Sequence, residues 1–143
     1  MYHEVLVNQN ILEKKQPLTA GEWEIIKKVP EYVQSILGDL PRFSLVKEIA
    51  CALYEHWDGT GYPHGRKGEE IPLSARIVSI ANVYDTLRCK RSYRPAYSQK
   101  EAVDIITGGD KRVNPSNFDP KILSLFKQEE KRIEKLYREE FNM

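Results

Sequence analysis

The chain has 143 residues, which is enough for one domain with a hydrophobic core. Its charged residues nearly balance at a formal net charge of +1, so the composition excludes a general electrostatic attraction to nucleic acid or anionic membranes. No apolar run reaches the roughly 18 residues of a membrane span and no signal-peptide pattern opens the chain, so we expect a cytoplasmic protein without membrane or nucleic-acid partners.

The first clear helix signal follows a weakly patterned start. Residues 1–18 indicate only a short helix or turn that leads into a loop. Thr19 and Glu22 have the spacing of a capping box, in which the two side chains satisfy backbone amides of the first turn. Apolar residues then recur at helical spacing up to Leu37, and Pro30 is expected to break or kink this helix.

Two further helices flank a long loop. The first is predicted from about Phe43 to His56, with one apolar face. The second begins at Pro72, a residue that suits the first helical position. Its apolar residues form a stripe that we expect to lie at the centre of the core: Leu73, Ile77, Ile80, Ala81, Tyr84 and Leu87.

The C-terminal part of the chain is also helical in pattern. Ser98 opens a short helix through a second capping box, and this helix is expected to end at about Thr107. After a loop that contains Gly and Pro, a highly charged helical region follows from about Lys121 to Phe141. We assign residues 128–143 to a C-terminal amphipathic helix.

No segment of the sequence alternates cleanly between apolar and polar residues, as a half-buried strand would. The sequence therefore predicts an all-α fold. We expect a single domain over residues 1–143, built as a helical bundle of about five to six helices with one long loop.

The stretch from Trp57 to Arg94 is the candidate functional region. It begins with a loop rich in Gly and Pro at residues 57–63 and ends in a cationic segment that includes Arg88 and Arg91. A long loop that keeps Trp and Tyr is more typical of a formed site than of a flexible linker.

Each loop residue also has a structural interpretation. We expect Trp57 to be the apolar anchor of the loop and Asp58 to hold a turn through its side chain. Gly59 and Gly61 are best explained by backbone conformations that other residues resist.

Several motifs occur in one order along the chain. They are Trp57–Pro63 (WDGTGYP), Lys67–Pro72 (KGEEIP), Ala75–Ile77 (ARI), Val83–Asp85 (VYD) and Arg91–Arg94 (RSYR). This order resembles the HD-GYP domain over roughly residues 7–127. The resemblance implies an all-α fold and descent from metal-dependent phosphodiesterases of cyclic di-GMP, which hold two or three iron or manganese ions through histidine and carboxylate ligands.

The chain departs from this family at the metal-binding positions. Where the family has ligand residues, this sequence has Val29, Leu53, Tyr54 and Asn82, and the signature Asp would fall at Met1. Leucine and valine cannot coordinate a metal, and the asparagine amide oxygen is a weak neutral ligand. We therefore expect no catalytic residue, no metal site and no cofactor. We also expect Leu53 to fill the former metal cavity as core, and Tyr54 to hydrogen-bond with Asn82.

The positions that the family uses to face the dinucleotide are retained. They correspond to Tyr62, Arg91 and Arg94, which become candidate ligand-binding residues for cyclic di-GMP. Arginine offers a planar fork that matches phosphate oxygens, and tyrosine offers a stacking face. The alternative is that Arg91 and Arg94 are solvated cations after a helix end.

Two other kinds of site stay open. His56 and His64 flank the loop, but two histidines without a third ligand make a poor zinc site, and both are explained as polar loop residues. In the family the loop is also associated with docking to diguanylate cyclase domains. The candidate partner contacts are then Trp57, Asp58, Gly59, Gly61, Tyr62 and Pro63.

The resemblance also implies that helices preceding the His-Asp motif in the family are missing here. The surfaces that they cover could become an interface with a partner, and the C-terminal helix from Ile133 to Phe141 could close a homodimer. The equally plain alternative is a solvated helix that packs on its own domain.

The main hypothesis is a catalytically inactive, HD-GYP-like regulatory domain that binds a partner protein or cyclic di-GMP. The first alternative is a metal-dependent cyclic di-GMP phosphodiesterase whose ligands come from elsewhere. The second alternative is a structural dimerisation module.

Overall fold

A computed structural model describes residues 11, 14, 16–90 and 95–141. Within these residues the chain is helical and contains no β-strand, which confirms the predicted all-α fold. The longer helices are α3 (Ala20–Lys27), α4 (Val29–Leu37), α5 (Ser44–Ala52), α6 (Leu73–Arg88), α7 (Gln99–Gly108), α8 (Pro120–Gln128) and α9 (Glu130–Phe141). Short 3₁₀ turns cover Pro41–Phe43, Gly68–Glu70 and Pro115–Asn117.

The helix starts follow the predicted capping signals. The Thr19 hydroxyl accepts from the Glu22 amide at 3.3 Å, and the Glu22 carboxylate accepts from the Thr19 amide at 2.6 Å. Ser98 and Glu101 form the same pair of bonds at the start of α7. The break expected near Pro30 falls at Lys28, which lies between α3 and α4.

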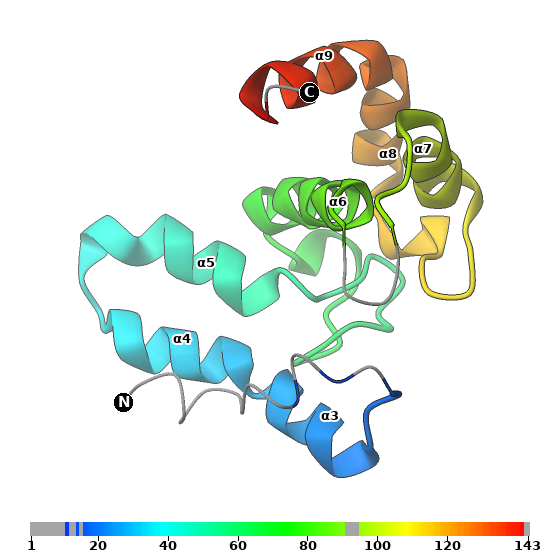
Figure 1. Ribbon diagram of the computed structural model, residues 1–143. Helices are drawn as coiled ribbons and strands as arrows, with labels where there is room; N and C mark the ends of the chain where they lie inside the picture. Colours follow the sequence, from blue (N-terminus) through cyan, green and yellow to red (C-terminus); the bar gives the residue numbers. More distant parts are fainter. Residues whose placement is uncertain (1–10, 12–13, 15, 91–94, 142–143) are drawn as a thin grey trace.

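Helix α6 lies at the centre of the domain, between α5 on one side and α7 with α8 on the other (Figure 1). The larger core cluster joins α6 to α7 and α8 through Ile80, Tyr84, Leu87, Ala102, Val103, Ile106, Phe118 and Phe126. A smaller cluster of Ala52, Ile71 and Ala75 joins α5 to α6. The long loop between α5 and α6 therefore begins and ends beside this smaller buried cluster.

The predicted core stripe of α6 is only partly right. Ile80, Tyr84 and Leu87 are buried as expected, but Leu73 and Ile77 are 56% and 49% exposed. Ala81 is exposed as well. Because α6 is covered by different helices at its two ends, the buried face near its start includes Ala75, which lies off the predicted stripe.

One predicted helix boundary is wrong. Helix α5 ends at Ala52 and does not continue to His56, because the next residues turn into the loop and the amide of Glu55 bonds to the Ala52 carbonyl. The predicted C-terminal helical region is divided at Glu129, which separates α8 from α9.

The bend at Glu129 brings Ile133 and Tyr137 of α9 against the larger core cluster. Leu136, on another face of α9, is 57% exposed. Among the described residues, no helix has both the length and the apolar character that a membrane span requires.

Arg88 does not belong to a solvated cationic segment. The residue is 8% exposed, and its Nη1 atom donates to the Tyr84 hydroxyl at 2.9 Å. Its guanidinium carbon lies 4.8 Å from the ring centroid of Tyr137. Arg88 thus connects α6 to α9 inside the domain, where aromatic faces stabilise its charge.

Candidate functional site

Glu55 holds the long loop against the end of α5. The residue is 2% exposed, its Oε1 accepts from the His64 amide at 2.8 Å, and its Oε2 accepts from the Arg66 amide at 2.9 Å. Charge-assisted bonds of this kind are stronger than bonds between neutral groups. The role of Glu55 as the organiser of the loop depends on these two bonds, which the sequence does not reveal.

Gly61 is required by a close approach of two backbone segments. A Cβ atom at this position would overlap the amide nitrogen of His56 and the carbonyl oxygen of Tyr54. The expectation of an unusual backbone conformation is therefore wrong for Gly61 and correct for Gly59, whose φ angle is +83°. The approach also lets the Tyr62 amide donate to the Tyr54 carbonyl at 3.0 Å.

Asp58 connects the loop to a second loop far along the chain. Its Oδ1 accepts from the amide and hydroxyl of Thr60 at 3.0 and 2.6 Å, and its Oδ2 accepts from Ser116 and Asn117 at 2.8 and 3.3 Å. Burial raises the pKa of Asp58, but the bonds from Thr60 and Ser116 outweigh this effect and hold the pKa below its usual value. Asp58 therefore acts as an ionised clamp between the two loops.

Trp57 lies beneath a buried ion pair. The guanidinium carbon of Arg76 is 5.6 Å from the Trp57 ring centroid, and Arg76 donates to the Asp119 carboxylate at 2.7 Å. Burial raises the pKa of Asp119, but the bonds from Arg76 and from the first amides of α8 outweigh it and lower the pKa overall. The Trp57 amide also donates to the Asn117 carbonyl at 2.8 Å, so this residue anchors the loop through both its ring and its backbone.

Tyr62 packs within a small aromatic group. Its ring stacks on Tyr54 with centroids 5.1 Å apart, and it meets the edge of Trp23 at 6.5 Å. Burial, with a smaller contribution from Tyr54, raises the pKa of Tyr62 to about 12. The predicted hydrogen bond between Tyr54 and Asn82 is wrong, because Tyr54 stacks on Tyr62 and no such bond joins these two described residues.

A groove of about 440 Å³ lies beside the loop, between the end of α5 and the middle of α6. Its lining includes Leu53, Tyr54 and Asn82, three of the four positions at which the resemblance places lost metal ligands. Val29, on α4, is not among the residues that line it. The expectation that Leu53 fills this space as core is wrong, since Leu53 is only half-buried and the groove stays open.

The side chains at this groove do not fit the family's iron or manganese ions. Among the described residues, no three His, Cys, Asp or Glu side chains converge on a point where a metal ion could bind. The lining positions offer a leucine side chain, a phenol and a neutral amide, which are poor ligands for these metals. His56 lines this groove whereas His64 lines a different one, so the two histidines do not share a site.

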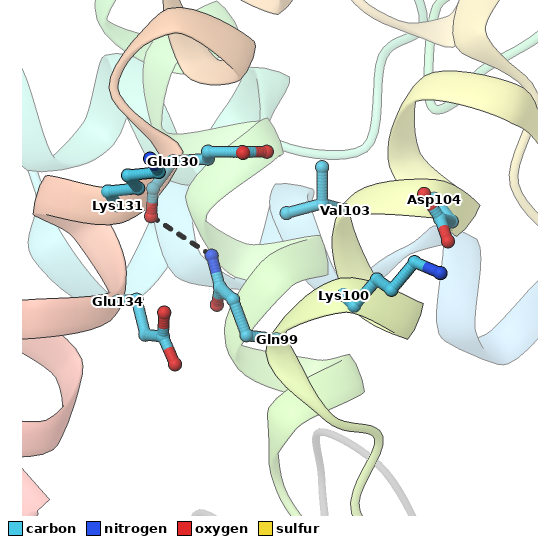
Figure 2. Close-up of a pocket in the computed structure, with 7 residues that line it drawn as sticks. All are labelled: Gln99, Lys100, Val103, Asp104, Glu130, Lys131 and Glu134. Atoms are coloured by element: carbon cyan, nitrogen blue, oxygen red, sulfur yellow. Dashed lines mark hydrogen bonds between the residues drawn. The ribbon is translucent and has the colours of Figure 1, made fainter.

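A further groove of about 450 Å³ lies between α7 and α9 (Figure 2). The side chain of Gln99 donates to the Glu130 carbonyl at 3.0 Å and joins the two helices there. Lys100 and Lys131 are balanced by three carboxylates, so this groove does not select an anion.

Two of the three candidate ligand residues, Arg91 and Arg94, lie outside the described residues. Tyr62 is described, but it does not line the 440 Å³ groove. Arg112, which the sequence did not single out, supplies a cation at this groove. Its guanidinium is held only loosely, 3.9 Å from Asp110 and 3.5 Å from the Tyr97 hydroxyl. No sequence signal identified it, because it reaches the groove from the loop after α7, far along the chain.

Comparison with known proteins identifies relatives that are named as phosphodiesterases of cyclic dinucleotides. The chain is 37% identical over 123 residues to a 3′3′-cGAMP-specific phosphodiesterase 2 of Vibrio cholerae, covering 85% of the chain and 23% of the relative. It is 39% identical to a probable cyclic di-GMP phosphodiesterase of the same organism, and this match covers 87% of the chain and 29% of the relative. A cyclic di-GMP phosphodiesterase of Thermotoga maritima is 34% identical, and this match covers 94% of the chain and 36% of the relative.

The chain spans about a quarter to a third of the length of these curated relatives. Among solved structures, a cyclic GMP-AMP specific phosphodiesterase of V. cholerae (V-cGAP3) matches with a TM-score of 0.48 and 27% identity, covering 86% of this chain and 31% of that one. A family model described as "HD domain" matches residues 8–122, which is most of the chain. The chain therefore belongs to the HD-domain family, and its relatives are the cyclic dinucleotide phosphodiesterases that the HD-GYP resemblance implied.

Proposed function

We propose that this chain is a regulatory domain that binds a cyclic dinucleotide such as cyclic di-GMP without hydrolysing it. One observation carries this proposal: the groove beside the loop is open, while the positions of the family's metal ligands on its wall are occupied by Leu53, Tyr54 and Asn82. The space for a ligand is kept, and the means to activate water at it are not.

The chemistry of hydrolysis supports the same conclusion. Metal-dependent hydrolysis of a phosphodiester needs metal ions that clamp the attacking and leaving oxygens and supply hydroxide. The donor set of the described groove does not fit such ions. Binding without hydrolysis needs only a cation for the phosphate and an apolar wall for the bases. Arg112 is the cation at this groove, and residues such as Leu53 and Val83 form an apolar wall.

The test is calorimetric titration with cyclic di-GMP in the presence of a chelator. We expect binding in the micromolar range, weakened about tenfold by Arg112→Gln, because a charge-assisted bond to phosphate is lost. Arg132→Gln is the matched control, since Arg132 is an exposed cation on α9 that pairs with Glu129 at 3.7 Å and does not line the groove. Absence of binding by the unmodified chain would contradict the proposal and leave Trp57–Pro63 as a surface for docking a partner protein.

The names of the relatives favour a second candidate, which is hydrolysis of cyclic di-GMP or 3′3′-cGAMP. In this case the metal ligands would have to come from residues outside the described groove or from another chain. Two measurements separate the candidates. The first is metal analysis of the purified protein, and the second is chromatography of cyclic di-GMP after incubation with the protein and manganese or ferrous iron. Two equivalents of metal together with turnover would establish the second candidate and overturn the first.

A further inference from the structure

His56 is held at the wall of the groove by a chain of hydrogen bonds. Its Nδ1 atom lies 3.0 Å from the Thr60 hydroxyl oxygen, and this hydroxyl lies 2.6 Å from Oδ1 of Asp58. Thr60 also donates its backbone amide to the same carboxylate oxygen. Asp58 also accepts from the Ser116 hydroxyl, which holds the carboxylate in place. The hydrogen-bonded side chains of His56, Thr60 and Asp58 thus form a relay that is fixed at Asp58.

The relay determines which nitrogen of His56 carries a proton. A hydroxyl has one hydrogen, and Thr60 donates it to the ionised carboxylate of Asp58, which can only accept. The Thr60 oxygen must therefore accept from His56, so that Nδ1 is the protonated nitrogen of the ring. The other nitrogen, Nε2, then carries a lone pair in the neutral ring.

The neutral ring is the favoured form in this setting. Burial lowers the pKa of His56, and the nearby carboxylates of Asp58 and Glu55 oppose this effect without reversing it. His56 lines the 440 Å³ groove, and in the described part of the chain its Nε2 has no hydrogen-bond partner. A hydrogen-bond acceptor of fixed orientation is therefore left for a molecule that occupies the groove.

We propose that His56 is a ligand-contacting residue whose Nε2 accepts a hydrogen bond from an N–H or O–H group of a bound nucleotide, with Thr60 and Asp58 as its positioning residues. The inference rests on the proposed function and adds to it the residue that recognises a donor on the ligand. Asn82 offers both a donor and an acceptor in the same groove, and Arg112 offers a cation for the phosphate. The ligand class is thus an anion that carries a base amino or imino group or a ribose hydroxyl.

The experiment compares two substitutions of His56 in the calorimetric titration with cyclic di-GMP. His56→Phe keeps the size of a flat ring and removes the acceptor, so we expect a loss of about tenfold in affinity. His56→Gln places a polar atom near the position of Nε2 and is expected to restore most of that affinity. His64→Phe is the matched control, because His64 lies on the same loop but lines another groove.

A spectroscopic measurement tests the relay without a ligand. Long-range ¹H–¹⁵N spectra of the His56 ring are expected to show a proton on Nδ1 and none on Nε2, and Thr60→Val is expected to abolish this preference. A proton on Nε2 in the unmodified chain would overturn the inference, as would equal affinities of His56→Phe and the unmodified chain. Failure of the unmodified chain to bind cyclic di-GMP would instead contradict the proposed function, and the inference that depends on it would fall too.

Discussion

At Gly61 the loop passes so close to the end of α5 that a methyl group has no room. The atoms that a Cβ would meet belong to the backbone of Tyr54 and His56, and these cannot rotate away as a side chain would. The same approach allows the backbone hydrogen bond between Tyr62 and Tyr54. A single absent atom therefore determines whether the loop can lie against the helix.

Gly61→Ala should lower the free energy of unfolding by about 1–3 kcal/mol or more, because the overlap must be relieved by moving backbone. Gly21→Ala is the control: nothing lies within 4 Å of its added Cβ and the residue is in α3, so this change should be neutral or slightly stabilising. Urea unfolding of both variants measures the difference. Equal stabilities would show that the loop does not pack as described.

Asp119 and Arg76 illustrate a charge pair that is stabilising only while both members are present. The Asp119 side chain is 3% exposed and that of Arg76 is 15% exposed. Asp119→Asn keeps a cap for α8 but leaves the Arg76 charge without its partner, so we expect a loss of roughly 3 kcal/mol at neutral pH. Asp39→Asn, which removes a fully exposed carboxylate that pairs with Lys47, should change stability little.

This pair also predicts a dependence of stability on pH. The folded-state pKa of Asp119 is lowered below its ordinary value of 3.8, so its ionised form stabilises the fold. That contribution is present above about pH 3.8 and is lost as the pH falls through the folded-state pKa. The difference in unfolding free energy between the unmodified chain and Asp119→Asn should therefore shrink on acidification. A difference that stays constant down to the acid transition would contradict this assignment.

At the scale of elements, the loop between α5 and α6 behaves as a structured unit. Glu55 fixes its later part, Asp58 ties it to the Pro115–Asn117 turn, and Trp57 anchors it under Arg76. The contacts of Asp58 and Trp57 join the loop to other segments of the chain, the Pro115–Asn117 turn and α6. The loop thereby forms one wall of the groove and fixes the orientation of His56.

Glu55→Gln tests this organisation. A glutamine side chain has one acceptor oxygen, so it can accept from only one of the two backbone amides that the Glu55 carboxylate now holds. The other backbone amide then faces the NH₂ group of the glutamine, which is a donor and cannot accept its hydrogen. We expect a loss of about 1–3 kcal/mol and faster hydrogen exchange at the amides of His64 and Arg66. Glu69→Gln, at an exposed position of the same connection, is the control. Unchanged exchange at both amides would show that other contacts hold the loop.

At the scale of the whole molecule, α6 joins two groups of helices, and the groove lies at this junction. Its walls come from the start of the loop between α5 and α6, from α6 and from the loop that follows α7. The site is therefore a product of the fold rather than of any one motif.

Metal ions should not stabilise this domain. A metal at about 100 times its dissociation constant would add about 2.7 kcal/mol to the stability of a chain that binds it only when folded, which is roughly 10 °C in Tm for a domain of this size. We expect the same Tm with manganese, with ferrous iron and with a chelator, measured by circular dichroism. A rise of several degrees with either metal would favour the phosphodiesterase candidate.

The sequence by itself determined the all-α class, the capping boxes at Thr19 and Ser98, and the family. These features depend on residues close together along the chain or on a fixed order of motifs, so no tertiary information is needed to recognise them. The assignment of Leu53, Tyr54 and Asn82 to the ligand positions of the family likewise rests on the sequence alone.

Only the tertiary structure decided which faces are buried and what the groove contains. The helical spacing of Leu73 and Ile77 is the same as that of Ile80 and Tyr84, yet only the latter pair is covered, because burial depends on which helices pack at each end of α6. The presence of Arg112 at the groove depends on segments far apart in the chain, and so does the bond from Ser116 that fixes Asp58. Such contacts leave no periodic trace in the sequence, and the chemistry of this site is set by them.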